Sequence, residues 1–483
     1  MLSRCYFHLT GHQLKSSDPL WGQLKNRSAV SICSELLGSL KLGADGVLVQ
    51  PNNTVQRKIL KQFADFHRTW IHGSWVFQNT FPDSYGGGVD IYDVQEPALY
   101  LTRNLATSEH YSKVLQGNNT AVGIRDNTKL IPALPAAAGG FLRPSRTTVN
   151  GTEGPNLNST IINYTTSSSF GLADLLALPV PLIQMGEIYG IEMRSYVGTP
   201  LLPVIWTEPY TAVATSTTEG VTVPQAFMAN RGGGAIGSVP YIMLNLGHGF
   251  DYKADGAAKL PRRYILSVFD DFLCRQGPFV RGSDVSIWLS AKNDAPGFRK
   301  SESCLRCHAS LDQSAMVLRN LRFGGTANAP SNAISDYRTP PVLLTYNADQ
   351  ASPTEFWPSS SQTNFHRSAP AGKLYMRNID GAIVDVGLSN LENLGQSLAN
   401  TPDYYACAAA RYFEYFTNNK VQLLDPYDIS NNDYMESLNV KEKAMRDFVL
   451  GLGRSLRSEG GTLKKLVIQI MESDYYSRAN FGR

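Results

Sequence analysis

Two cysteines and a histidine stand close together in the run Cys304-Leu305-Arg306-Cys307-His308. This C-x-x-C-H spacing is the attachment pattern of c-type haem. Residues three apart lie on one face of a helical turn, so both thiols could add across the two vinyl groups at one edge of a porphyrin. His308 would then bind the iron as its proximal axial ligand. The sequence therefore predicts one covalently attached haem c, held by Cys304, Cys307 and His308.

The same residues could instead hold zinc or form a redox-active dithiol. Zinc would need a second pair of ligands, and the other four cysteines are isolated from one another. A thioredoxin-like pair would follow a strand in a β-α-β unit, whereas Ser301-Glu302-Ser303 looks like the start of a helix. These comparisons favour haem over both alternatives.

A sixth iron ligand, if one exists, should come from a segment downstream of the motif. On a continuing helix, Met316 would lie about 12 Å along the axis from His308, on the proximal side. Met376 is the first choice, because it stands in a short extended piece before the Asp380-Gly381 turn, and a Met sulfur raises the potential of a haem. His366 is the competitor, and Met376 could also simply fill the core.

The four cysteines outside the motif make an even number: Cys5, Cys33, Cys274 and Cys407. An oxidising compartment could pair them, and Cys5 with Cys33 is a plausible local bridge. Four free buried thiols are the alternative.

Attachment of c-type haem takes place on the outer side of the inner membrane. We therefore expect a periplasmic or other extracytoplasmic protein in which Cys5 and Cys33 are bonded. The N-terminal run MLSRCYFHLTGHQL lacks the apolar core of a signal peptide. We expect that the true start lies upstream of Met1, or that a leader has been removed.

The charge of the chain is nearly balanced, with 44 Lys and Arg against 41 Asp and Glu in 483 residues. Nucleic-acid binding would need a basic stripe. The densest basic spots, Arg262-Arg263 and Lys464-Lys465, are short and typical of solvated surface. No apolar stretch reaches the roughly 18 residues of a transmembrane helix. We expect no nucleic-acid partner and no transmembrane segment; a redox partner protein would be unknown.

The length suggests two to four structural units, and apolar residues recur at helical spacing. We expect a mainly α fold with long irregular loops, which includes a cytochrome c-like haem domain. The expected helices are 28–42, 52–71, 96–115, 261–274, 389–400, 403–417, 440–456 and 462–476. The expected regions are an N-terminal helical region at 1–230, with a loop insertion at about 116–170, a haem-bearing region at 231–385, and a C-terminal helical region at 386–483.

Gly232, Gly234 and Gly237 match the G-x-G-x-x-G pattern of dinucleotide-binding proteins. That function needs a buried strand before the first glycine and an acidic residue about 20 positions later. The preceding run QAFMANR does not have the pattern of a buried strand. A Gly-rich backbone turn is the better interpretation.

Several segments that share their order with the haem motif resemble the planctomycete-type multidomain c-type cytochromes, whose domains are mostly of unknown function. The resemblance runs from about residue 90 to the C-terminus. The matching segments are YDVQEPALYLTRNLATSEHYSKVL (92–115), GGGAIGSVPYIM (232–243), LPRRYILSVFDDFLCRQGPFV (260–280), FRKSESCLRCHASLD (298–312) and FVLGLGRSLRSEGGTLKKLVIQIMESDYYSR (448–478). The resemblance implies a fold and a haem cofactor more than a reaction.

The motif and the resemblance together predict a mono-haem cytochrome that transfers one electron at a time. The first alternative is a haem enzyme with an open axial position, peroxidase-like, in which His366 could act as the distal acid or base. The second alternative is an extracellular binding protein in which the haem is structural.

Overall fold

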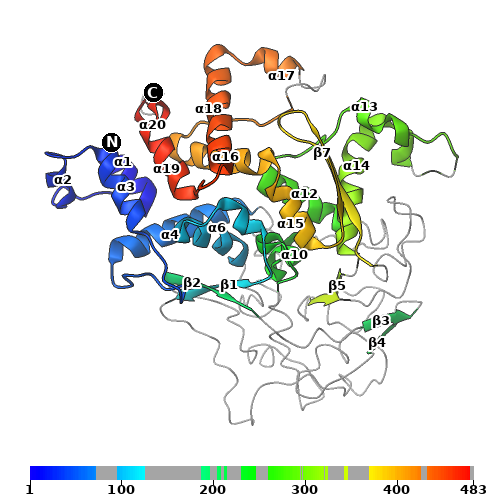
Figure 1. The fold of residues 1–483 in the computed structure, drawn as a ribbon, viewed down its shortest axis with the longest axis horizontal. Coiled ribbons are helices and arrows are strands. Elements are labelled where there is room, and N and C mark those ends of the chain that lie inside the picture. Colours follow the sequence, from blue (N-terminus) through cyan, green and yellow to red (C-terminus); the bar gives the residue numbers. More distant parts are fainter. Residues whose placement is uncertain are drawn as a thin grey trace, which may run out of the picture.

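The computed structural model shows a mainly helical protein with short two-stranded antiparallel sheets (Figure 1). It describes residues 1–71, 95–125, 187–195, 204–207, 211–214, 230–245, 259–293, 295, 297–319, 321–324, 342–345, 369–425 and 432–478. The expectation of a mainly α fold is confirmed for this part of the chain. Most of the loop insertion expected at about 116–170 lies outside the described residues.

The N-terminal helices are α1 (Leu2–Thr10), α2 (Leu20–Gln23), α3 (Ala29–Ser39), α4 (Thr54–Arg68) and α6 (Glu96–Thr107). Asn53 caps α4, because its side-chain oxygen accepts hydrogen bonds from the N–H groups of Val55 and Gln56 at 3.0 and 3.2 Å. The helix expected at 96–115 ends early. Ser108 adopts the left-handed conformation, with φ 60°, and a 3-10 turn, η1 (Tyr111–Leu115), follows it.

The middle of the chain contributes helices α10 (Val239–Asn245), α12 (Lys259–Leu273), α13 (Gly282–Val285) and α14 (Glu302–Ala315). Strands β7 (Gly372–Arg377) and β8 (Ile383–Leu388) form an antiparallel hairpin that packs along α14. The other strand pairs are β1 (Thr120–Arg125) with β2 (Ile188–Arg194), β3 (Val204–Thr207) with β4 (Thr211–Ala214), and β5 (Leu321–Gly324) with β6 (Val342–Thr345).

The C-terminal helices are α15 (Leu391–Ala399), α16 (Pro402–Thr417), α17 (Asn432–Ser437), α18 (Val440–Arg457), α19 (Leu463–Glu472) and α20 (Asp474–Arg478). The side chain of Thr401 caps α16, and Pro402 stands at its first position, where a missing N–H is harmless. The single helix expected at 462–476 is interrupted at Ser473, which separates α19 from α20.

One hydrophobic core joins the described parts of all three expected regions. Helix α16 is central to it and packs against α12, α18 and α19. Tyr404 of α16 stacks on Tyr111, with the ring centroids 4.3 Å apart. The first and last helices lie side by side (Figure 1), and Arg4 donates a hydrogen bond of 2.6 Å to the carbonyl of Tyr476. The expected boundaries near 230 and 385 therefore divide the sequence without dividing this core.

Candidate functional site

Helix α14 carries the whole C-x-x-C-H motif in its first two turns. Leu305 and Ala309, which lie one turn apart, are buried in a small apolar cluster with Tyr375 of β7. This cluster anchors one side of the helix. Cys304 is exposed and Cys307 is half-buried, and both are free thiols.

The two cysteines and the histidine share one side of α14. Because successive residues of an α-helix are about 100° apart around its axis, Cys304, Cys307 and His308 fall within an arc of about 100°. The helix from Glu302 to Ala315 is continuous through all three. The helical turn on which the two thiols were expected to share a face is therefore present, and it carries His308 on the same side.

His308 is held in place by its neighbour one turn later. Its Nδ1 lies 3.2 Å from both carboxylate oxygens of Asp312, which is buried. The ring of Phe298 stacks on the imidazole, with the centroids 4.4 Å apart and 13° between the planes. An ionised carboxylate can only accept hydrogen bonds, so Nδ1 carries the proton. The other ring nitrogen, Nε2, is then left with its lone pair for a metal.

Arg262 of α12 completes this arrangement. Its Nη2 donates to Asp312 at 3.0 Å, and its Nε donates to the second carboxylate oxygen. The same guanidinium lies 5.7 Å from the centre of the Phe298 ring. Arg262 therefore neutralises the buried carboxylate and also contacts Phe298, whose ring stacks on His308.

The interpretation of the two basic pairs as solvated surface is correct for Arg263 and Lys465, which are exposed, and wrong for Arg262 and Lys464. Only 20% of the Arg262 side chain is exposed, because the guanidinium binds Asp312. Lys464 is 8% exposed and donates to the carbonyls of Leu40 and Ala106 at 2.5 and 3.2 Å. Burial, helped by the charge of Lys41, lowers the pKa of Lys464 to about 8. Both side chains donate to acceptors that are distant in the sequence, so their sequence neighbours could not predict these contacts.

Cys307 lies against a tight loop. Burial raises the pKa of its thiol, Arg306 opposes this rise and Cys304 adds to it. Gly277 has φ 92°, and a Cβ atom at this position would lie 3.2 Å from the sulfur of Cys307. The positive φ favours glycine here, and a Cβ atom would lie close to the thiol.

The four remaining cysteines form the disulfides Cys5–Cys33 and Cys274–Cys407. The expected local bridge is confirmed, and the alternative of four free thiols is wrong. Cys304 and Cys307 are thus the only unpaired cysteines among the six in the chain, all of which lie in its described part.

The β7–β8 hairpin packs against the side of α14 that faces away from His308. Ser310 donates its hydroxyl proton to the carbonyl of Tyr375, and it lies about 160° from His308 around the helix axis. Met376, the next residue of β7, is completely buried in the main core. This position suits a core-filling residue. The role of Met376 as sixth ligand stays a prediction, which this arrangement does not favour, and His366 lies outside the described residues.

The glycines from 232 to 237 form the expected backbone turn. Gly232, Gly233 and Gly234 all have positive φ, and the N–H of Gly232 donates to the side chain of Asn230 at 2.7 Å. A Cβ atom on Gly237 would lie 1.7 Å from the carbonyl oxygen of Gly232. The turn is buried and is explained by packing alone.

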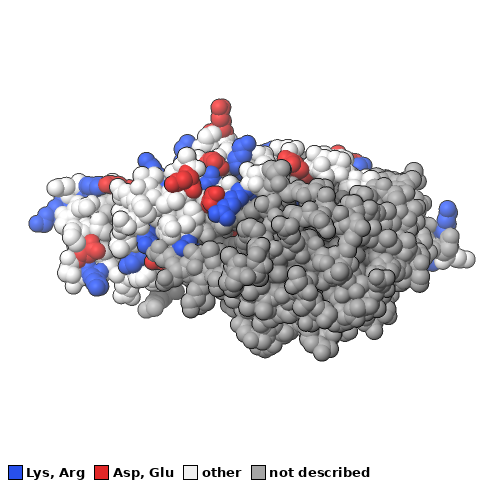
Figure 2. All heavy atoms as spheres, turned by 90° about the horizontal axis from the view of Figure 1, so that it is seen from below, with Lys and Arg blue, Asp and Glu red and all other residues white. Residues whose placement is uncertain are grey.

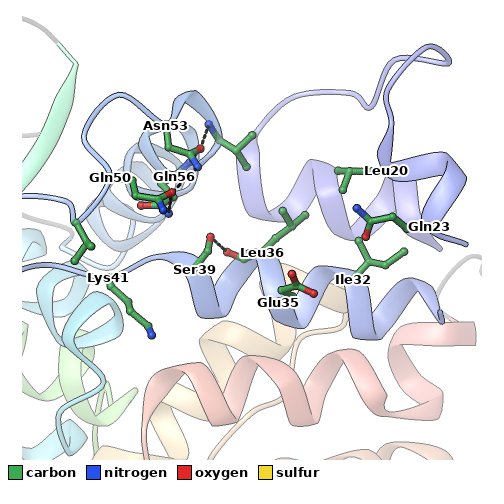
Figure 3. Close-up of a pocket in the computed structure, with 12 residues that line it drawn as sticks. Leu20, Gln23, Ile32, Glu35, Leu36, Ser39, Lys41, Gln50, Asn53 and Gln56 are labelled. Carbon is green, nitrogen blue, oxygen red and sulfur yellow. Dashed lines mark hydrogen bonds between the residues drawn. The ribbon is translucent and has the colours of Figure 1, made fainter. Parts of the chain in front are cut away.

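A separate groove of about 470 Å³ lies at the N-terminal end of the molecule (Figure 3). Amide side chains gather at the start of α4, and apolar side chains line the part between α2 and α3. Gln56 is 3% exposed, and its Oε1 has no hydrogen-bond partner among the described residues. The lining residues are Leu20, Gln23, Ile32, Glu35, Leu36, Ser39, Lys41, Val49, Gln50, Asn53, Val55 and Gln56. The size suits a small ligand, and none of the motif residues takes part.

Basic and acidic side chains of the described residues are interspersed on the face shown in Figure 2. Within the described ranges, no helix is long and apolar enough to cross a membrane. No protein-family model matches the chain, and neither a curated protein nor a solved structure matches it.

Proposed function

We propose that this chain is a mono-haem c-type cytochrome that transfers one electron at a time through haem c bound at Cys304, Cys307 and His308. One observation carries the proposal: two free thiols and an imidazole share a face of α14, and a buried carboxylate holds Nδ1 of the imidazole. This donor set fits the group, because thiols can form the thioether bonds and Nε2 could bind the iron.

The residues of the site have distinct roles in this proposal. When bound, haem c would supply an iron centre that changes between the ferric and ferrous states. Cys304 and Cys307 would hold the porphyrin edge against α14, and His308 would present Nε2 to the iron. Gly277 has no side chain that would crowd the sulfur of Cys307.

We further propose that the chain belongs with the planctomycete-type multidomain c-type cytochromes, with residues 231–385 as the cytochrome c-like region. The segments that share their order with the motif support this membership. A periplasmic or other extracytoplasmic location is supported by the two disulfides, since disulfides persist in oxidising compartments. An unidentified redox protein would exchange the electron.

The first prediction concerns the covalent bond itself. After production in a host that matures c-type cytochromes, acid–acetone extraction should leave the haem on the polypeptide. The variant Cys304→Ser/Cys307→Ser should lose it completely, because no thioether can form. The matched control Cys5→Ala/Cys33→Ala removes two cysteines outside the site and should keep the haem. If the colour leaves the wild-type protein with the solvent, the proposed function is wrong.

Strand β7, which carries Met376, packs on the side of α14 that faces away from His308. This position supports the alternative of a haem enzyme with an open axial position, because Met376 is poorly placed to bind the iron. A six-coordinate, low-spin ferric spectrum would favour electron transfer, and a high-spin spectrum would favour the enzyme.

A second prediction, for Met376→Ala, tests the ligand directly. Because Met376 is buried on the side of α14 away from His308, we expect this change to leave the haem absorption spectrum unaltered. It should lower the free energy of unfolding by about 2 to 5 kcal/mol. Absorption spectra and urea denaturation measure the two effects. Loss of a near-infrared charge-transfer band, with conversion to a high-spin haem, would instead identify Met376 as the sixth ligand.

A further inference from the structure

We propose that Asp312, held by Arg262, is a positioning residue that fixes the orientation of His308 and lowers the one-electron potential of the haem. This inference rests on the proposed function, because it concerns the ligand that the haem iron would use.

The carboxylate of Asp312 contacts both Arg262 and His308, and these three residues form a small polar network. Its side chain has no exposed surface, and its two oxygens face both Arg262 and Nδ1 of His308. A buried charge needs a partner of opposite sign, which the guanidinium supplies. The guanidinium therefore balances the charge of the carboxylate beside the imidazole.

The network also fixes how the imidazole can turn. Asp312 fixes the direction of Nδ1, and the Phe298 ring, parallel within 13°, fixes the plane of the imidazole. Arg262 contacts both of these residues, since it donates to Asp312 and lies over the ring of Phe298. Nε2, on the other side of the ring from the carboxylate contact, is thereby held in a defined direction.

A charged acceptor on Nδ1 changes the electron density of the ligand. A histidine that donates to a carboxylate becomes a more basic metal ligand. A more basic imidazole favours ferric over ferrous iron, so one-electron reduction occurs at a lower potential. Asp312 would hold the Nδ1 proton of His308 in both oxidation states of a bound haem.

The first experiment measures the midpoint potential of the loaded protein in a mediated titration with dithionite and ferricyanide. In Asp312→Asn, a neutral acceptor replaces the carboxylate, and we expect the ferrous form to gain about tenfold in the equilibrium constant, a rise of about 59 mV for one electron. The control is Asp284→Asn, because Asp284 is a half-buried aspartate that also pairs with an arginine, Arg377, at 2.7 Å. The control should change the equilibrium constant less than twofold. An unchanged potential in Asp312→Asn would overturn the inference.

The second experiment does not need haem. In the full chain with Cys304→Ser and Cys307→Ser, nitrogen-15 NMR at alkaline pH reports which ring nitrogen of His308 carries the proton. We expect the proton on Nδ1. A proton on Nε2 would overturn the role of Asp312 without bearing on haem attachment. Loss of haem from the wild-type protein, with the proton on Nδ1, would reject the proposed function alone.

Discussion

Replacing Cys274 and Cys407 with alanine should lower the free energy of unfolding by about 5 kcal/mol. The disulfide joins residues 133 positions apart. A cross-link that closes such a long loop removes much conformational entropy from the unfolded chain. Urea denaturation without reductant, compared with the unmodified protein, measures the loss.

The second disulfide is the matched control. Cys5 and Cys33 are 28 positions apart, so Cys5→Ala/Cys33→Ala should cost about 3.5 kcal/mol. The order of the two losses tests the loop-closure argument. An equal or greater loss for the Cys5–Cys33 pair would contradict it.

The Cys274–Cys407 disulfide also lies close to the site. Cys274 directly follows α12, and Cys407 is buried in the middle of α16. Three residues after Cys274, Gly277 lies against the thiol of Cys307. The disulfide therefore ties the loop that borders the haem motif to the central helix of the core.

Sequence reasoning is successful where the information is local. The helix that begins after Asn53 can be predicted from its amphipathic pattern and its cap, and the shared face of Cys304, Cys307 and His308 follows from helical geometry. The early end of α6 could not be predicted in the same way. Ser108 is not a typical helix-ending residue, yet it takes the left-handed conformation, and its N–H donates to the carbonyl of Asn104.

The contacts that need the tertiary fold remain hidden in the sequence. Asp312 stands four residues after His308, so its contact with the imidazole follows once a helix is assumed. Arg262 stands 50 positions before Asp312, and the two meet only because α12 packs on α14. The pairing of Cys274 with Cys407 depends in the same way on the contact between α12 and α16.

His67 is a neutral histidine in the middle of the core. It has no exposed surface, and its nitrogens bind Thr102 at 2.8 Å and Tyr412 at 2.6 Å. The hydroxyl of Thr102 donates its proton to the carbonyl of Ala98, so it accepts from Nδ1 of His67. Tyr412 then donates to Nε2. Both nitrogens are satisfied by the neutral ring, and a proton on Nε2 would force the Tyr412 hydroxyl to turn its own proton away.

Burial lowers the pKa of His67 from its ordinary value of 6.5 to about 3. Below pH 6.5 the unfolded chain therefore binds a proton at this residue that the folded protein does not bind. Stability then falls as the pH drops from 6.5 toward 3, by up to about 1.4 kcal/mol per pH unit. His8, whose pKa is lowered to about 4 by burial and by Arg4, contributes with the same sign.

The variant His67→Gln isolates this effect. At pH 7 it should be less stable than the wild type by about 2 kcal/mol, because the packing of a buried ring is lost. Since glutamine does not titrate, the stability difference between the two proteins should shrink by about 3 kcal/mol between pH 6.5 and 4, and the variant should become the more stable protein. Urea denaturation at a series of pH values measures this difference.

Tyr412→Phe provides the control for this experiment. It removes the hydrogen bond to Nε2, at a cost of about 1 kcal/mol, but leaves His67 buried and able to titrate on unfolding. The stability difference between Tyr412→Phe and the wild type should therefore stay nearly constant over the range in which His67→Gln recovers. A difference between His67→Gln and the wild type that does not change with pH would show that the folded protein accommodates the charged ring. Acid loss of stability would then have to arise from other groups, with His8 as the first to test.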